Sequence, residues 1–510
     1  MFRLLGLLGG LSVATDLGTG APMEESLRRC VVAARLARVV GCADDEIGDV
    51  IYTALLQHLG CTAYAHELAR DFGDDVAVTR VAFLTNVAEP TDYLRTWAPG
   101  VAAATGQARS TVLAKTLVSG TKLGTDGPAA TCEVAQDAAR QLRLGEAVQT
   151  GLSQTTAMWN GKGYPRVAGA EISRCARIMH VASTAVMFCL HDDAGRAVTE
   201  VARRSGTYLD PDLAAAFGGH SAALLDGLED VDAYRHVLDS EPDPVRLVAQ
   251  ESLEAVARTF GALVDLKSPR FQGHSAAVAD LAAEASALLG LGDEAPTVRV
   301  AGYLHDLGRV GVSSRIWDKA AALTATEEDA VRLHPYHTER ILARVPELAA
   351  VTPLAGQHHE RCDGTGYPHG VLAAQLSLPS RLLACADAYR CLIEDRPGRR
   401  ALSAAQAADS LRAEARSGRL DADAVAGVLT AAGHGQGARR PRPAGLSDRQ
   451  VEVLRLVASG LSNREIARRL GISPRTAEHH VQDVYLRIGR SSRAGAAMYA
   501  MEHGLSGIPG

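Results

Sequence analysis

Seven residues in the second half of the chain have side chains that bind metal ions. They are His274, His305, Asp306, His334, His358, His359 and Asp387. Imidazole nitrogen suits borderline metals such as Fe, Mn and Zn, and a carboxylate can bridge two such ions. A lone histidine on a helix is usually structural or solvated, but here five histidines and two aspartates recur along one stretch. The set predicts a two-metal site built from several helices.

The order of these residues and one loop sequence point together to a family. The order is His, His-Asp, His, His-His, Asp, and the segment "DGTGYP" contains Gly366, Tyr367 and Pro368. Both features closely resemble the HD-GYP branch of the HD phosphohydrolase superfamily. The resemblance runs from roughly Glu251 to Gly433.

This resemblance implies a role for each matching residue. One metal takes His274, His305, Asp306 and Asp387, and the other takes His334, His358 and His359, with Asp306 bridging the two. The ions are two divalent cations, Fe or Mn, with a hydroxide between them as the nucleophile. The implied substrate is cyclic di-GMP or a related nucleotide. Asp306 and Arg309 are the expected catalytic residues, and Arg309 is expected to contact the substrate together with Gly366, Tyr367 and Pro368.

Three positions depart from the family pattern. Arg309 stands where the family usually has lysine, and arginine clamps phosphate but cannot donate a proton at neutral pH. Arg270 stands where three-metal members carry glutamate, so two metals are expected. Thr338 replaces the glycine that usually follows the pair His334-Pro335. These departures leave activity expected, with a nucleotide sensor as the alternative.

The front half resembles a worn copy of the same domain. "WNGKGYPRVAG" parallels "RCDGTGYPHGV", "LLQHLG" parallels "YLHDLG", and "GTYLDPDL" parallels "GRLDADAV", in the same order. On this alignment Glu25 replaces His274, Gln57 replaces His305, His58 replaces Asp306, Thr155 and Thr156 replace the His-His pair, and Ser183 replaces Asp387. Hydroxyls in place of imidazoles predict no metal there. Such a domain could brace its neighbour, bind a regulatory ligand or pair with a second copy.

The last part of the chain has the pattern of a helix-turn-helix. Capping-box patterns at Ser447 and Ser462 each precede a helical run, and Gly471 and Ser473-Pro474 separate the second run from a third. This segment closely resembles the LuxR-type DNA-binding module. The residues expected to face the major groove are Arg475, Thr476, Glu478, His479 and Gln482. The family commonly has lysine at the position of Glu478, which either reads cytosine or is a solvated charge.

Charge supports this division of the chain. The whole chain carries a net charge of −6, but the residues from Arg439 onward contain 12 Arg and 6 acidic residues. Positive charge is therefore concentrated where double-stranded DNA would bind. The acidic remainder argues against contact with nucleic acid or an anionic membrane surface.

Composition predicts an all-α protein with several domains. The sequence is rich in alanine and poor in aromatic residues, and it shows little strand signal. We expect a worn HD-GYP-like repeat over 1–238, an HD-GYP domain over 239–433, a linker over 434–445 and the DNA-binding module over 446–510. The apolar start "MFRLLGLLGGLSVATD" is too short and too broken by glycine to span a membrane. It is interpreted as the first helix of the repeat.

Cysteine usage and symmetry complete the expectations. Nine scattered cysteines without a CxxC pair fit a reducing cytoplasm, and Cys362 is interpreted as a small filler beside the site. One helix-turn-helix per chain suggests a homodimer on two half-sites. Three functions stay open: a cyclic di-GMP phosphodiesterase joined to a transcription factor, a transcription factor whose HD-GYP domain only senses a nucleotide, and a phosphohydrolase of another nucleotide.

Overall fold

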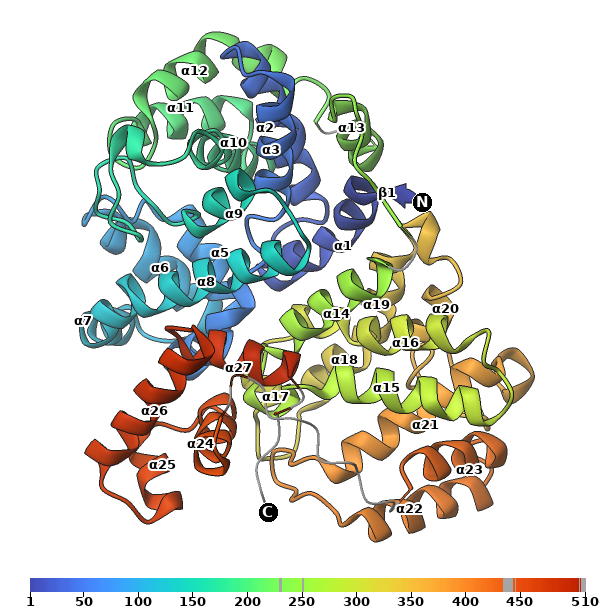
Figure 1. Cartoon of the computed structure of the whole chain (residues 1–510). Coiled ribbons are helices and arrows are strands. Elements are labelled where there is room, and N and C mark those ends of the chain that lie inside the picture. Colours follow the sequence, from blue (N-terminus) through green and yellow to red (C-terminus); the bar gives the residue numbers. More distant parts are fainter. Residues whose placement is uncertain (229–231, 250–251, 434–443, 445, 504, 506–510) are drawn as a thin grey trace. The chain divides into compact units, whose positions relative to one another are not determined.

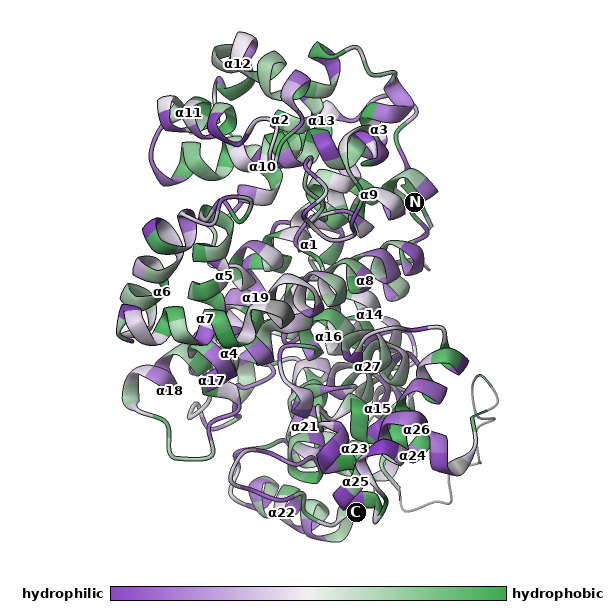
Figure 2. Cartoon of the chain, turned by 90° about the vertical axis from the view of Figure 1, so that its left-hand side faces the viewer, coloured by the Kyte–Doolittle hydropathy of each residue, from purple (hydrophilic) through white to green (hydrophobic). Residues whose placement is uncertain are grey.

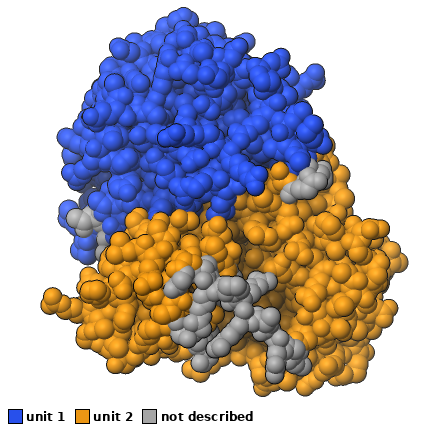
Figure 3. Space-filling view, in the orientation of Figure 1, with its two compact units in different colours: residues 1–250 blue, residues 251–510 orange. Residues whose placement is uncertain are grey.

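The computed structural model divides the chain into two compact units, residues 1–250 and 251–510 (Figure 3). The structure describes residues 1–228, 232–249, 252–433, 444, 446–503 and 505. Most of the linker predicted at 434–445 lies outside the described residues. The predicted domain boundaries stay predictions, and we describe each unit by itself.

The first unit is built almost entirely of helices (Figure 1). Its helices are α1 (Leu4–Gly18), α2 (Glu25–Val39), α3 (Asp44–Leu55), η1 (Cys61–Tyr64), α4 (Ala65–Phe72), α5 (Asp75–Leu84), η2 (Tyr93–Trp97), α6 (Ala98–Thr105), α7 (Arg109–Gly124), α8 (Asp126–Gln141), α9 (Glu146–Ser153), η3 (Gly169–Glu171), α10 (Arg174–His191), α11 (Ala194–Arg204), α12 (Pro211–Leu225) and α13 (Ala233–Ser240). Two short strands, β1 (Phe2–Arg3) and β2 (Leu247–Val248), pair antiparallel, with Phe2 opposite Val248.

The second unit holds the predicted metal ligands and the helix-turn-helix. Its helices are α14 (Ser252–Asp265), η4 (Pro269–Phe271), α15 (His274–Leu288), α16 (Ala295–Leu304), η5 (Leu307–Gly311), α17 (Ser314–Trp317), α18 (Ala325–Arg332), α19 (His334–Leu342), η6 (Pro346–Leu348), α20 (Thr352–Gly356), η7 (Ala373–Gln375), α21 (Leu378–Ile393), α22 (Ala404–Arg416), α23 (Ala422–Ala431), α24 (Asp448–Ala458), α25 (Asn463–Leu470), α26 (Pro474–Ile488) and α27 (Arg493–Glu502). The all-α prediction is confirmed, and among the described residues the only strands are the two short ones of the first unit.

Side chains at the helix ends explain where many of these helices begin. Ser377 accepts a hydrogen bond from the backbone N–H of Ser380 at the start of α21, and Asp421 caps α23 by accepting from two N–H groups. Many helices carry both apolar and polar residues, as the hydropathy colouring shows (Figure 2). The apolar residues supply the core, so that each unit buries leucine, valine and alanine between its helices.

The same hydrogen bonds recur at matching places in the two units. In the first unit the carboxylate of Asp16 accepts from the backbone N–H and the hydroxyl of Ser26. In the second unit Asp265 accepts from the same two groups of Ser275. Each serine follows the first residue of its helix, Glu25 in α2 and His274 in α15.

Close backbone contacts extend this correspondence. A Cβ on Gly60 would lie 2.0 Å from the carbonyl oxygen of Thr131, and one on Gly308 would lie 2.0 Å from that of His334. Both positions therefore require glycine. The backbone N–H of Tyr164 donates to the carbonyl of Thr156, just as the N–H of Tyr367 donates to that of His359. Asp210 pairs with Arg177 at 2.7 Å, and Asp421 pairs with Arg381 at 2.8 Å.

The two units differ most between these shared contacts. The first unit inserts helices α4 to α7 between Gly60 and Thr131. This insertion has a small core of its own around Phe72, Val78 and Trp97, in which the rings of Phe72 and Trp97 meet edge to face at 5.5 Å. Among the described residues, no helix is long and apolar enough to cross a membrane.

Candidate metal centre and DNA-binding helix

Five separate segments of the second unit bring the seven predicted ligands together. His274 opens α15, the pair His305-Asp306 follows α16, His334 opens α19, His358 and His359 follow α20, and Asp387 lies within α21. All seven side chains are buried except that of His359, which is 15% exposed. Helix ends and the turns after them therefore place six of the ligands, and only Asp387 projects from inside a helix.

The carboxylate of Asp306 lies at the centre of this cluster. Its Oδ2 atom lies 2.9 Å from Nε2 of His305 and 3.6 Å from Nε2 of His274. Its Oδ1 atom lies 3.3 Å from Nε2 of His334 and 3.5 Å from Nε2 of His358. The two oxygens thus face two different groups of imidazoles, as a carboxylate that bridges two cations must.

Three of the histidines are held in one tautomer by the backbone. The Nδ1 atoms of His305, His334 and His358 lie 2.6–2.7 Å from the carbonyl oxygens three residues earlier in the chain. A carbonyl oxygen only accepts, so each Nδ1 must carry the proton. In the neutral ring, Nε2 then presents a lone pair to the centre of the cluster.

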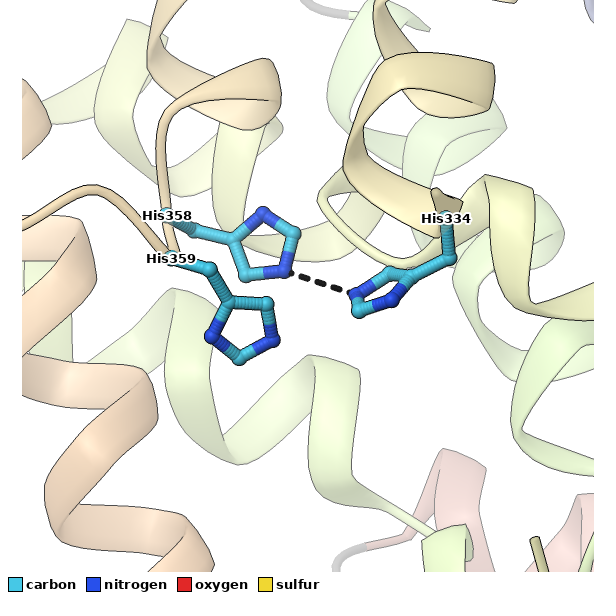
Figure 4. Close-up of side chains that lie close together, drawn as sticks. All are labelled: His334, His358 and His359. Atoms are coloured by element: carbon cyan, nitrogen blue, oxygen red, sulfur yellow. Dashed lines mark hydrogen bonds between the residues drawn. The ribbon is translucent and has the colours of Figure 1, made fainter. Parts of the chain in front are cut away.

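With this tautomer, the spacing of His334 and His358 shows whether the pair fits a cation. The Nε2 atoms of His334 and His358 lie 3.1 Å apart (Figure 4). With both Nδ1 atoms protonated, neutral rings would direct two lone pairs at each other, which repel unless a proton or a cation lies between them. Burial lowers the pKa of His334 to about 4, which disfavours the proton. The pair therefore fits a metal ion.

The second carboxylate, Asp387, completes the cluster on its other side. Its Oδ1 atom lies 3.2 Å from Nε2 of His274, and its Oδ2 atom lies 3.7 Å from Nδ1 of His359. Two groups among the described residues could each hold an ion: His274, His305 and Asp306, and His334, His358 and His359. A third group joins His274 and Asp387 to Cys391.

Burial and neighbouring charges set the protonation of these groups. Burial raises the pKa of Asp306, but Arg309 and His305 outweigh it and hold that pKa well below its usual range. Burial lowers the pKa values of His305 and His359. The carboxylate is therefore ionised and these rings are neutral near pH 7, which are the forms that bind metals.

Two sequence profiles match this chain. The profile described as "HD domain" matches residues 258–424, and the profile described as "Bacterial regulatory proteins, luxR family" matches residues 444–500. The 3'3'-cGAMP-specific phosphodiesterase 3 of Vibrio cholerae is 30% identical over 416 residues, which are 79% of this chain and 88% of that protein. The chain belongs to the HD-GYP family of phosphohydrolases. Behind its HD-GYP domain it carries a LuxR-type DNA-binding domain.

Other HD-GYP proteins match shorter parts or match by fold. A cyclic di-GMP phosphodiesterase of Pseudomonas aeruginosa is 40% identical over 138 residues, which are 26% of this chain and 33% of that protein. The crystal structure of a cyclic GMP-AMP-specific phosphodiesterase of Vibrio cholerae matches with a TM-score of 0.57 and 24% identity. The match covers 84% of this chain and 97% of the chain in that crystal structure, which shows a shared fold.

Arg309 of the HD-GYP domain lies inside the cluster. Its Nη1 atom is 2.6 Å from Oδ2 of Asp306, and its side chain is 4% exposed. The guanidinium lies over the rings of Phe271 and Trp317, 4.5 Å and 5.4 Å from their centroids. These rings fix a flat, permanently charged group beside the carboxylate.

The loop that gives the HD-GYP family its name packs against the cluster. The ring of Tyr367 stacks on His359 with 4.7 Å between centroids, and the guanidinium of the exposed Arg332 lies 4.8 Å from the centroid of Tyr367. Gly366 has no room for a side chain, because a Cβ there would lie 2.3 Å from the backbone nitrogen of Arg361. Pro368 completes the turn, and the buried carboxylate of Glu360 accepts three backbone N–H bonds from the residues after it.

Three residues near the cluster were missed by sequence reasoning. The carboxylate of Glu394 accepts a hydrogen bond from Nδ1 of His274 at 2.8 Å, and the thiol of Cys391 lies 3.3 Å from Oδ1 of Asp387. Glu360 holds the loop. Cys391 stands four residues after Asp387 on one helix, so helical spacing could have drawn attention to it. Glu394 meets a residue 120 positions away, and no local signal announces that contact.

The structure places the predicted DNA-contacting residues on one exposed face of α26. Arg475, Thr476, Glu478, His479 and Gln482 are all exposed. The buried side of the same helix consists of Ala477, Val481, Val484, Tyr485 and Ile488. Both predicted capping boxes, at Ser447 and Ser462, are present, and Gly471 ends α25 with a left-handed conformation. The exposed face is free to enter a groove.

Proposed function

We propose that this chain is a two-metal phosphodiesterase of a cyclic dinucleotide and a DNA-binding regulator in one molecule. The observation that carries the enzymatic part is the convergence of imidazole lone pairs on the two oxygens of Asp306, with distances of 2.9–3.6 Å. A site that only senses a nucleotide has no need of such a ligand set. Cyclic di-GMP is the first substrate to test.

Each ligand has a place in this proposal. His274, His305 and Asp387 hold one divalent cation, His334, His358 and His359 hold the other, and Asp306 lies between them. Fe and Mn suit this mixture of imidazole and carboxylate. Bound there, two cations would supply a hydroxide nucleophile and neutralise charge on the phosphate. Hydrogen bonds at Nδ1 already hold four of the rings, those of His274, His305, His334 and His358.

Arg309 and Tyr367 have supporting roles. The guanidinium of Arg309 offers positive charge to the phosphoryl oxygens from beside Asp306, and it stays protonated throughout the reaction. Tyr367, stacked on His359, offers its ring to a base or ribose at the edge of the site. The backbone of Gly366 allows the substrate to approach closely.

A second substrate is supported by the relatives. The Vibrio cholerae protein that matches 79% of this chain is described as specific for 3'3'-cGAMP, whereas the shorter Pseudomonas aeruginosa match is described as acting on cyclic di-GMP. Hydrolysis of 3'3'-cGAMP is therefore the alternative. Both substrates would present the same kind of phosphodiester bond to the two cations.

The decisive test is turnover of both dinucleotides by the full chain loaded anaerobically with Fe or Mn. The variant Asp306→Ala should abolish product formation, because it removes the bridging carboxylate. The matched control is His58→Ala, which changes the corresponding position of the first unit and should leave turnover within about twofold of the wild type. Metal-loaded wild type that hydrolyses neither dinucleotide would contradict the enzymatic proposal.

The DNA-binding part rests on the exposed face of α26. Arg475, Thr476, Glu478, His479 and Gln482 would face the major groove of double-stranded DNA, and the chain would bind as a homodimer on two half-sites. Arg475→Ala should weaken binding of a mixed-sequence duplex at low salt, measured by fluorescence anisotropy. Arg412→Ala, an exposed arginine of α22, is the control and should leave binding unchanged. Equal affinities for all three proteins would contradict the assignment.

The first unit is proposed to be a metal-free copy of the HD-GYP domain. The shared hydrogen bonds at Asp16 and Asp265, and the shared glycine contacts at Gly60 and Gly308, support the duplication. The two contacts from Tyr164 and Tyr367 support the alignment of Thr156 with His359.

A further inference from the structure

One of the four histidines that face Asp306 is held differently from the other three. His305, His334 and His358 each bond through Nδ1 to a backbone carbonyl three residues earlier. His274 is the first residue of α15, after the left-handed Gly273, so the chain three residues before it is outside the helix. A backbone partner of that kind is absent there, and the side chain of Glu394 takes its place at 2.8 Å.

The carboxylate of Glu394 is itself firmly held. It follows the end of α21, and its side chain is 16% exposed. Arg390 lies 3.0 Å from its Oε1 atom, and Arg396 lies 3.2 Å from its Oε2 atom. The guanidinium of Arg396 in turn lies 5.0 Å from the centroid of Phe271, the ring that also carries Arg309. Two arginines thus aim one carboxylate at Nδ1 of His274.

We propose that Glu394 is a positioning residue that orients His274 and strengthens its bond to the cation on that side of the centre. The inference rests on the proposed function, because it needs a metal at Nε2 of His274. A carboxylate that accepts the Nδ1 proton fixes the tautomer, as the backbone carbonyls do for the other rings. It also carries a full negative charge, so it makes the imidazole a stronger ligand than a carbonyl would.

The two metal positions are therefore unequal in this chain. Backbone carbonyls lie behind the rings of His334 and His358, whereas a carboxylate lies behind the ring of His274. Loss of a partner behind a ligating histidine costs about 10–100-fold in metal affinity. Removing Glu394 should thus weaken one binding step and leave the other.

The test is a titration of the full-length apo protein with Mn²⁺, with free Mn²⁺ followed by its EPR signal. Glu394→Ala should weaken one of the two binding steps by about 10–100-fold and change the other by less than about threefold. Glu394→Gln keeps an acceptor but loses the charge, so it should give a smaller loss at the same step. Thermal unfolding of the metal-free proteins shows whether each variant is folded.

A matched control is available in the same unit. Glu339 lies 2.7 Å from Nε2 of His369, a histidine outside the cluster, so Glu339→Gln removes a similar pair and should leave both binding steps unchanged. Equal affinities of the wild type, Glu394→Ala and Glu394→Gln would overturn the inference while the proposed function stands. Equal weakening of both steps would also overturn it. A wild-type protein that binds no Mn²⁺ would instead contradict the proposed function.

Discussion

The centres of the two units are built from different side chains. In the second unit, imidazole nitrogens surround the carboxylate of Asp306, and we propose that cations bind between them. In the first unit, the fully buried Arg29 points a guanidinium into the corresponding place, with Nη1 2.9 Å from Oε1 of Gln57 and 3.1 Å from the ring of His58. Gln57 and His58 are the positions aligned with His305 and Asp306.

Other residues around Arg29 also differ from their counterparts in the second unit. Glu25, aligned with His274, pairs with Arg80 at 2.8 Å, and His58 stacks on Phe83 with 4.5 Å between ring centroids. Burial raises the pKa of Asp16 to about 7, although Arg29 opposes the rise. The second unit has Val278 four residues after His274, where the first unit has Arg29 four residues after Glu25.

This difference teaches what each part of the shared scaffold does. The contacts of Asp16 and Asp265 with their serines are the same with or without imidazoles at the centre. These contacts therefore belong to the shared scaffold, whereas the two centres differ in the side chains that fill them. We propose that the guanidinium of Arg29 takes the place of a metal ion in the first centre.

The largest expected effect follows from removal of that guanidinium. Arg29→Met removes the buried guanidinium that donates to Gln57 and opposes the rise in the pKa of Asp16, and it should destabilise the first unit by about 3–5 kcal/mol. Urea unfolding of the full chain measures it. Val278→Met changes the matching position of the second unit and should cost at most about 1–3 kcal/mol by overpacking. Equal costs at the two positions would mean that Arg29 is a passive filler.

Arg309 offers the corresponding test in the second unit. Arg309→Ala removes the charge beside Asp306 and should lower turnover of the cyclic dinucleotide by about 10²–10³-fold. Arg309→Lys should recover part of this loss, since lysine keeps the charge but not the fork. Cys61 stands three residues after His58, as Arg309 stands three after Asp306, so Cys61→Ala is the control with unchanged turnover. Full activity of Arg309→Ala would remove it from the catalytic residues.

A smaller expected effect is a pH dependence of the stability of the first unit. His180 of α10 is buried, its Nε2 atom lies 3.1 Å from the carbonyl of Thr155, and burial lowers its pKa to about 4. The unfolded histidine titrates near 6.5, so the unfolded state binds more protons between about pH 6.5 and about pH 4. Stability of the first unit should fall as the pH drops through that window, by roughly 3 kcal/mol at most.

The matching position of the second unit is Ala384, which cannot titrate. His180→Gln keeps a donor for the Thr155 carbonyl and removes the titration, so unfolding of the first unit should depend less on pH between 6.5 and 4. Urea midpoints measured at several pH values test this. A wild type and a His180→Gln variant with parallel pH profiles would show that His180 does not contribute.

Residue types and spacing predicted much of this molecule. The seven predicted ligands were recognisable from their order, and the helix-turn-helix was recognisable from its capping residues and from Gly471. The helix signals are local, because each depends on neighbours a few residues away. The alignment of His358 with Thr155 was likewise readable from short matching segments.

The residues behind and between the ligands were not predictable in this way. Arg29 lies in the segment "ESLRRC", where two adjacent arginines suggest a solvated helix face, yet its side chain is fully buried. Glu394 is one of many acidic residues, and only the fold brings it to His274. A long-range partner leaves no periodic trace in the sequence, so the structure was needed to find both.

Counting bound metal tests the central contrast between the two units most directly. The full chain is stripped with a chelator, reloaded with Mn²⁺, freed of excess and analysed by elemental mass spectrometry. The account predicts two ions per chain in the wild type, one fewer in His358→Ala, and still two in Thr155→Ala, the matching change in the first unit. Loss of metal from Thr155→Ala, or two ions retained by His358→Ala, would contradict it.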